Sequence, residues 1–80
     1  MKYRRKLKVK SPVSLGSSLT PLQFHIFTSD RLLGWVDYGT VVNTCKPYPA
    51  RGGVVRNATN IEVGRALNSL VNRGLLDIRR

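Results

Sequence analysis

The clearest periodic pattern along the chain lies in residues 59–73. Its apolar residues recur at the spacing of one helix face, namely Val63, Ala66, Leu67, Leu70 and Val71. Thr59 and Glu62 form a T-x-x-E capping box before this face, and Gly74 after it suits a left-handed helix end. The pattern predicts a helix with one buried face, followed directly by a short strand, "LLDIRR", at residues 75–80.

Two further helices are predicted upstream. Thr20 and Gln23 form a T-x-x-Q capping box at the start of "PLQFHIFTSDRLL". That run has apolar residues on two sides, so it is either a helix covered on both sides up to Gly34 or a helix that breaks near Ser29. After a short extended "WVD", Asp37 is placed to cap a third helix, "YGTVVNTC". The apolar residues of that helix share one face, namely Tyr38, Val41, Val42 and Cys45.

The remaining segments lack a helical pattern. From Tyr3, residues 1–11 alternate between cationic and other side chains, which indicates either a basic strand or a disordered basic arm. Residues 12–18 are rich in serine and are expected to be a linker. Residues 46–58, "KPYPARGGVVRNA", contain two prolines and a Gly-Gly pair, so we expect a basic loop that is long for a connection between helices.

Chain length, net charge and cysteine content limit the classes of function that the sequence allows. The 80 residues indicate one domain, and fourteen Lys and Arg against four acids give a net charge of +10, which favours a polyanionic partner. The sequence lacks a membrane-spanning or signal segment, and its single cysteine, Cys45, fits a reducing compartment. We therefore expect a cytoplasmic protein, at the nucleoid or in the cytoplasm of a host cell. No metal-ligand set, paired carboxylates or phosphate-binding loop is evident, and His25 is interpreted as structural, so we expect neither an enzyme nor a bound cofactor or metal.

The polar face of the last predicted helix carries candidate chemistry. Opposite its apolar face lie arginine, amide and hydroxyl side chains with one isoleucine, namely Ile61, Arg65, Asn68, Ser69 and Asn72. Side chains of these types read base edges in the major groove of DNA, and we take these five as base-reading candidates. The candidates for phosphate contacts are the basic residues Arg4, Arg5, Lys6, Lys8, Lys10, Lys46, Arg51, Arg56, Arg73, Arg79 and Arg80.

The order of elements and the segment "VGRALNSLVNRGLLDIRR" resemble the recognition helix and first wing strand of winged helix-turn-helix repressors of the MarR type. "LTPLQ" is similar to the start of the first helix in that family, so the resemblance covers residues 19–80. It implies an α+β fold, mostly helical, in which three helices accompany a small β element. The sequence departs from the family in its long 46–58 loop and in lacking a second wing strand after residue 80. The basic N-terminal strand is expected to pair with "LLDIRR" in place of that strand.

These observations lead to a small basic protein that binds double-stranded DNA sequence-specifically and regulates transcription or replication, with a homodimer as a candidate assembly. Two alternatives remain open at this point. One is an RNA-binding or ribosome-associated winged-helix protein. The other is a protein-interaction module, which requires an exposed apolar patch near Phe24, Phe27 or Trp35.

Overall fold

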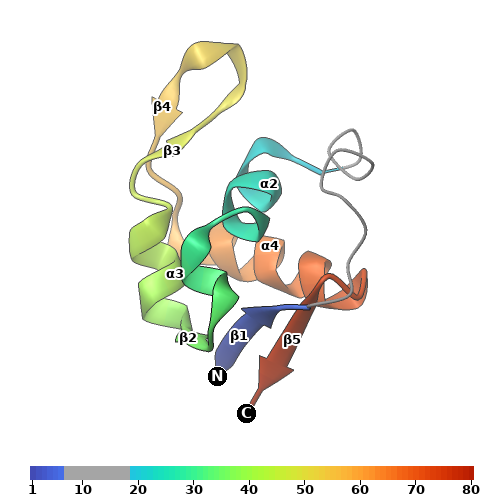
Figure 1. The fold of residues 1–80 in the computed structure, drawn as a ribbon. Coiled ribbons are helices and arrows are strands. Elements are labelled where there is room, and N and C mark those ends of the chain that lie inside the picture. The colour runs from blue at the N-terminus through green and yellow to red at the C-terminus, as the bar shows by residue number, and fades with distance from the viewer. Residues whose placement is uncertain (7–18) are drawn as a thin grey trace.

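A computed structural model describes residues 1–6 and 19–80 of the chain (Figure 1). The strands are β1 (Lys2–Arg5), β2 (Val36–Asp37), β3 (Tyr48–Pro49), β4 (Val55–Arg56) and β5 (Leu76–Arg79). The helices are α2 (Pro21–Phe27), α3 (Tyr38–Thr44) and α4 (Asn60–Asn72), with short 3-10 turns η2 (Asp30–Leu33) and η3 (Arg51–Gly53). The fold is therefore α+β with three α-helices among the described residues, as expected. The expected linker, residues 12–18, lies outside them.

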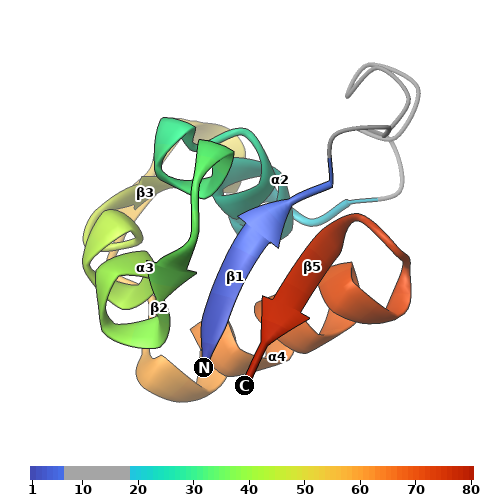
Figure 2. The same ribbon diagram turned by 60° about the horizontal axis from the view of Figure 1, so that its bottom comes forward.

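Three strands form an antiparallel sheet in the order β2-β1-β5, with β1 at its centre (Figure 2). Tyr3 pairs with Val36 on one side and with Ile78 on the other. The predicted pairing of the N-terminal strand with "LLDIRR" is confirmed, and the strand alternative holds for residues 2–5. Because β1 is the middle strand, both strand pairings of the sheet involve it.

The apolar faces predicted from the sequence meet in one core. Val63, Leu67 and Leu70 of α4 are fully buried, which confirms the periodic pattern. Tyr3 contributes to the same core from the inner side of β1, because alternate residues of a strand face opposite sides of the sheet. Cys45 is also fully buried, and desolvation raises the pKa of its thiol to about 11. Its interpretation as a small buried apolar residue agrees with this position.

Polar side chains start all three helices as the sequence predicts. Thr20 and Thr59 each accept a hydrogen bond from the third residue of their helix in a reciprocal capping box. Asp37 caps α3 by accepting from the backbone N–H of Thr40, and the hydrogen bonds with Thr40 are the main cause of its lowered pKa. These caps satisfy backbone donors that have no partner inside the helix.

The helix ends agree only in part with the sequence. Gly74 adopts φ 75°, the left-handed conformation predicted for it. The alternative in which the first helix runs up to Gly34 is wrong, and Gly34 itself is extended, with φ −125°. The first helix had already ended at Phe27, and Ser29 starts a separate 3-10 turn by accepting from the backbone N–H of Arg31. The alternative in which that run breaks near Ser29 is therefore confirmed.

The segment 46–58 contains no α-helix, as expected, but the expectation of an irregular loop is wrong. Its strands β3 and β4 form a small hairpin that projects from the body of the molecule (Figure 1). Ala50 donates to the carbonyl of Val54 at 2.7 Å, and Gly52 and Gly53 both take φ 74° in the turn. A hairpin forms here because the two glycines allow the left-handed turn while a β-branched pair follows them.

His25 and Tyr48 join the hairpin to the helices. The Nε2 of His25 lies 2.9 Å from the carbonyl oxygen of Thr44, and its ring packs 6.2 Å from that of Tyr48. A carbonyl oxygen can only accept, so Nε2 carries the hydrogen in this contact. The structural interpretation of His25 is confirmed by these contacts.

Candidate nucleic-acid interface

Helix α4 presents a polar face to solvent opposite its buried side. Ile61 is 70% exposed, and Arg65, Asn68 and Asn72 are exposed along the same helix. Ser69, the fifth base-reading candidate, is half-buried. Four of the five candidates are thus accessible together on one element. Because the opposite side of α4 is buried in the core, these four side chains point to solvent.

The electrostatics of this face are dominated by arginine. Glu62 is the only acid in α4, and its carboxylate accepts a hydrogen bond from the backbone N–H of Thr59 in the capping box. Arg65 has no ion-pair or hydrogen-bond partner among the described residues. The Tyr38 hydroxyl donates to the carbonyl of Asn60, which ties the first turn of α4 to α3. The helix therefore combines a fixed backbone with an unpaired guanidinium group.

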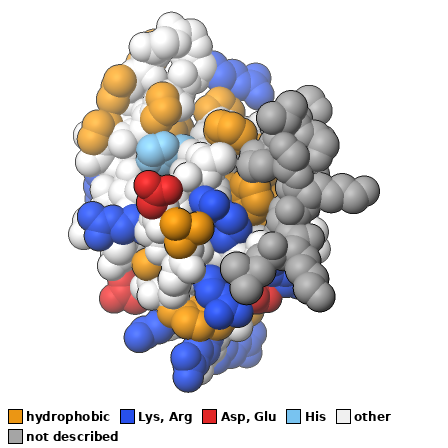
Figure 3. All heavy atoms as spheres, viewed as in Figure 1, with side chains coloured by type: hydrophobic (Ala, Val, Ile, Leu, Met, Phe, Trp, Pro, Cys, Tyr) orange, Lys and Arg blue, Asp and Glu red, His pale blue; other side chains and the backbone are white. Residues whose placement is uncertain are grey.

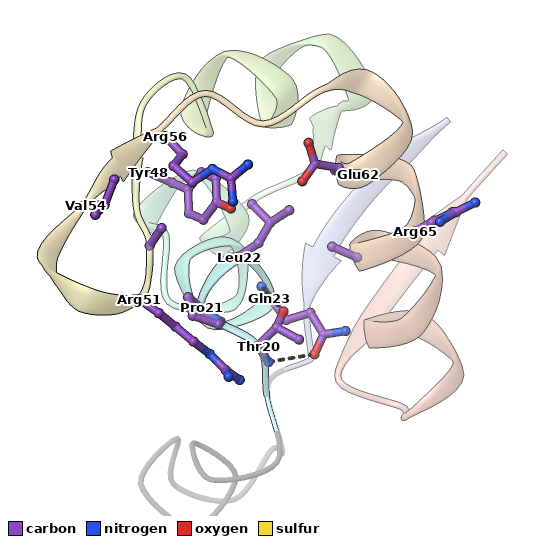
Figure 4. Close-up of a pocket in the computed structure, with 12 residues that line it drawn as sticks. Thr20, Pro21, Leu22, Gln23, Tyr48, Arg51, Val54, Arg56, Glu62 and Arg65 are labelled. Atoms are coloured by element: carbon purple, nitrogen blue, oxygen red, sulfur yellow. Dashed lines mark hydrogen bonds between the residues drawn. The ribbon is translucent and has the colours of Figure 1, made fainter.

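An open groove of about 730 Å³ separates α4 from the β3–β4 hairpin, with the start of α2 between them (Figure 4). It is lined by residues that include Leu22, Tyr48, Val54, Arg51, Arg56 and Arg65. In the close-up, Arg56 lies beside Tyr48, and Arg65 projects from α4 away from the hairpin. Arg51 and Arg56 are exposed and have no partner among the described residues. Three unpaired arginines therefore border this groove.

The cations on the outer side of the sheet are engaged with other groups. Arg4 lies 3.4 Å from a carboxylate oxygen of Asp77, and Lys6 lies 3.9 Å from the other. The guanidinium groups of Arg4 and Arg79 lie 4.6 and 5.7 Å from the ring centroid of Trp35. Such contacts stabilise a cation through the electron-rich ring face. These phosphate candidates are therefore partly occupied within the protein.

Arg5 turns toward the protein body. Its Nε donates to the carbonyl of Phe27 at 2.6 Å, and a terminal nitrogen donates to the carbonyl of Ser29 at 2.9 Å. The guanidinium group also lies 5.4 Å from the Phe27 ring centroid. These carbonyls stand where α2 ends and η2 begins, so Arg5 anchors that junction to β1. This position gives Arg5 a structural role that the alternating pattern did not indicate.

The remaining phosphate candidates are distributed around the molecule. Lys46 is exposed between α3 and the hairpin, Arg73 is the residue that ends α4, and Arg80 is exposed after β5. Lys8 and Lys10 lie outside the described residues. Figure 3 shows Lys and Arg side chains gathered at the lower end of the molecule, where Figure 1 places β1 and β5, with others beside the hairpin.

Some residues of this surface escaped the sequence analysis. Trp35 stacks under two arginines, and Val54 and Val55 are 55% and 64% exposed on the hairpin. A β-branched pair directly after Gly-Gly was a usable hairpin signal. Nothing in the local sequence indicates the stacking at Trp35, because its partners come from β1 and β5. Among the apolar residues proposed for a protein-binding patch, Phe24 is exposed but Phe27 is 1% exposed.

Comparisons add no further guide to the function. The chain matched no known family, no characterised protein and no solved structure. Within residues 1–6 and 19–80, no helix has the length and apolar character needed to span a membrane. The same residues contain no group of three or more potential metal-ligating side chains.

Proposed function

We propose that this protein binds double-stranded DNA sequence-specifically, as a small regulator of transcription or replication, with α4 as its recognition helix. The observation that carries the proposal is the exposed face of α4, where an unpaired Arg65 stands with exposed Asn68 and Asn72 on a rigidly held helix. The only acid of the helix is engaged in its cap.

The chemistry of that face matches the major groove. Arginine can donate two parallel hydrogen bonds to guanine, and asparagine can form a bidentate pair with adenine. An exposed isoleucine such as Ile61 suits contact with a thymine methyl group. Solvent-facing helices more often mix Glu and Lys, which pair along the helix. The composition of this face is therefore better explained by base contacts than by solubility.

The arrangement of the sheet supports a winged-helix interpretation. In that family the strand after the recognition helix pairs with a second wing strand. In this protein β5 follows α4 directly and pairs with β1, which lies between β5 and β2. We propose that β1 takes the place of the second wing strand. Arg80 and Lys46 are exposed cations outside α4 that can add phosphate contacts.

The proposal is tested with Arg65→Ala, measured on a preferred duplex obtained by selection from random DNA. We expect a loss of about 1–3 kcal/mol on that duplex and a relaxed preference at one base pair. The matched control is Arg31→Ala, which also removes an exposed arginine without a described partner, but from η2. All measurements use one salt concentration, because affinity for DNA depends steeply on salt.

The control decides the interpretation. If Arg65→Ala and Arg31→Ala have the same effect on preferred and scrambled duplexes, α4 does not read sequence. Structured RNA is added as a competitor in a separate series. If it displaces the preferred duplex at equal concentration, the RNA-binding alternative replaces the proposal.

A further inference from the structure

We infer that the β3–β4 hairpin is a second DNA-contacting element, which grips the phosphodiester strand bordering the major groove that α4 enters. This inference rests on the proposed function and assigns a role to a segment that the recognition helix does not explain. The occupant of the groove between hairpin and α4 would be one sugar–phosphate backbone of the same duplex.

The base of the hairpin is firmly attached to the protein. Tyr48 is 7% exposed and packs in the core, and the N–H of Ala58 donates to the carbonyl of Cys45 at 3.1 Å. Tyr48 pairs with Arg56 across the hairpin, so these two side chains lie on the same side of the strands. Tyr48 faces the body of the protein. Arg56 lies on the same side of the hairpin, which is the side that borders the groove, as Figure 4 shows.

The charge of the groove fits a phosphodiester strand. Residues 46–58 contain no acid, and both hairpin arginines, Arg51 and Arg56, line the groove without a described partner. Arg65 borders it on the α4 side, but its side chain projects away from the hairpin (Figure 4), and the one acid at the border, Glu62, accepts a hydrogen bond in the cap of α4. Guanidinium groups bind phosphate oxygens with two donors at once. A phosphodiester strand on the hairpin side of α4 would therefore meet Arg51 and Arg56, while Arg65 stays free to contact bases.

The apolar residues of the hairpin are consistent with the same occupant. Val54 lines the groove and is 55% exposed, so more than half of its surface is available for contact. A deoxyribose ring offers an apolar edge between successive phosphates. Val54 is placed to contact such a sugar while the neighbouring arginines contact the phosphates on either side.

The first test is the salt dependence of binding by the double variant Arg51→Ala/Arg56→Ala. If each arginine contacts one phosphate, the slope of log K against log salt should become less steep by about 1.8, at about 0.9 for each contact. The affinity for preferred and scrambled duplexes should fall by the same factor. The variant Arg51→Lys/Arg56→Lys keeps both charges and should retain most of the slope.

The matched control is Lys2→Ala/Arg31→Ala, which removes the same charge from exposed residues that do not line the groove. Circular dichroism confirms that each variant is folded. An equal change of slope in the control and the hairpin variant would mean that net charge alone acts, and would overturn the inference. An unchanged slope in the hairpin variant, while Arg65→Ala still alters base preference, would overturn the inference and leave the proposed function intact. Absence of duplex binding by the wild-type protein would overturn both.

A second test locates the hairpin on the DNA. Val55→Cys carries a thiol-linked iron–EDTA group, which cuts nearby deoxyribose. Cys45 should stay unlabelled at neutral pH, because it is fully buried and its pKa is about 11. We expect cuts beside the base pair whose preference depends on Arg65. The same group attached through Arg31→Cys is the control. Cuts from the control alone, or from neither variant, would contradict the inference. Displacement of DNA by an acidic peptide bound in the groove would then not count as support for it.

Discussion

The cations of the sheet and those beside the groove differ in what they already contact. On the sheet and directly after β1, Arg4 and Lys6 lie against Asp77, Arg79 lies over Trp35, and Arg5 donates to two backbone carbonyls. On the hairpin and α4, the guanidinium groups of Arg51, Arg56 and Arg65 have no described partner.

This difference shows why the net charge of a segment does not by itself identify a binding surface. An arginine that already donates to carbonyls must lose those bonds before it can bind a phosphate, whereas an unpaired one exchanges only water. The basic N-terminal segment is the most cationic part of the sequence, yet in the described residues much of its charge supports the fold. The groove has fewer cations, but they are available.

The largest expected effect tests whether the two sides of α4 have separate roles. Leu67 is fully buried, so Leu67→Ala should lower the free energy of unfolding by about 2–5 kcal/mol, through lost burial and a residual cavity. Arg65→Ala, on the exposed side of the same helix, should change it by less than about 0.5 kcal/mol. Thermal and urea unfolding measure both. A large loss of stability in Arg65→Ala would mean that this arginine supports the fold, as the cations of the sheet do.

The next effect compares an engaged arginine with an unpaired one. Arg5→Ala removes two charged hydrogen bonds at the end of α2 and should cost about 1.5–3 kcal/mol of stability. Arg51→Ala removes the same side chain without a described partner and should leave urea unfolding nearly unchanged. Equal unfolding midpoints for the two variants would remove the distinction between the regions.

A smaller effect is expected when the partner of the sheet cations is removed. Asp77→Asn keeps the shape of the side chain but releases Arg4 and Lys6 from their carboxylate. The loss of stability should be below about 1 kcal/mol, because both ion pairs are partly exposed. Affinity for scrambled duplex DNA should rise, since two cations become available for phosphates. A fall in that affinity would show that Asp77 holds these cations in a binding arrangement.

The smallest expected effect is on the pH dependence of stability, and it is absent at neutral pH. Burial, with a contribution from Tyr38, raises the pKa of Tyr3 above its usual value of 10.0. Because the folded pKa is the higher one, the contribution of Tyr3 to stability is complete below about pH 10 and is lost as pH rises through the folded value. Unfolding of the wild-type protein should therefore show a component above pH 10 that Tyr3→Phe lacks. Identical pH profiles for the two proteins would contradict the buried position of this hydroxyl.

Local signals in the sequence were sufficient to predict where the helices begin and which face of α4 is buried. Capping boxes at Thr20 and Thr59, the cap at Asp37 and the apolar face of α4 each depend on residues close in sequence, and the structure confirms all of them. The pairing of β1 with β5 was also predictable, because an edge strand without a neighbour requires a partner.

The contacts of the cations could not be predicted in this way. Arg5 binds carbonyls more than 20 positions away, and these become accessible only because α2 ends early. Trp35 lies under arginines from β1 and β5, two strands that are far apart in sequence and meet only in the folded sheet. The exposed face of α4, with the base-reading candidates, was predicted from periodicity. The groove beside it depends on the β3–β4 hairpin, whose signal, a β-branched pair after Gly-Gly, was not read as a hairpin.

The central place of β1 has a consequence for biosynthesis. Arg4 and Asp77, which face each other across the sheet, are 73 positions apart. A ribosome releases the N-terminal strand long before β5, so we expect the nascent chain to carry a cationic β segment without its main neighbour while the helices form. Closure of so long a loop is entropically costly, and we expect the sheet to form last. The anionic ribosomal RNA near the exit tunnel is therefore the first polyanion that this segment meets.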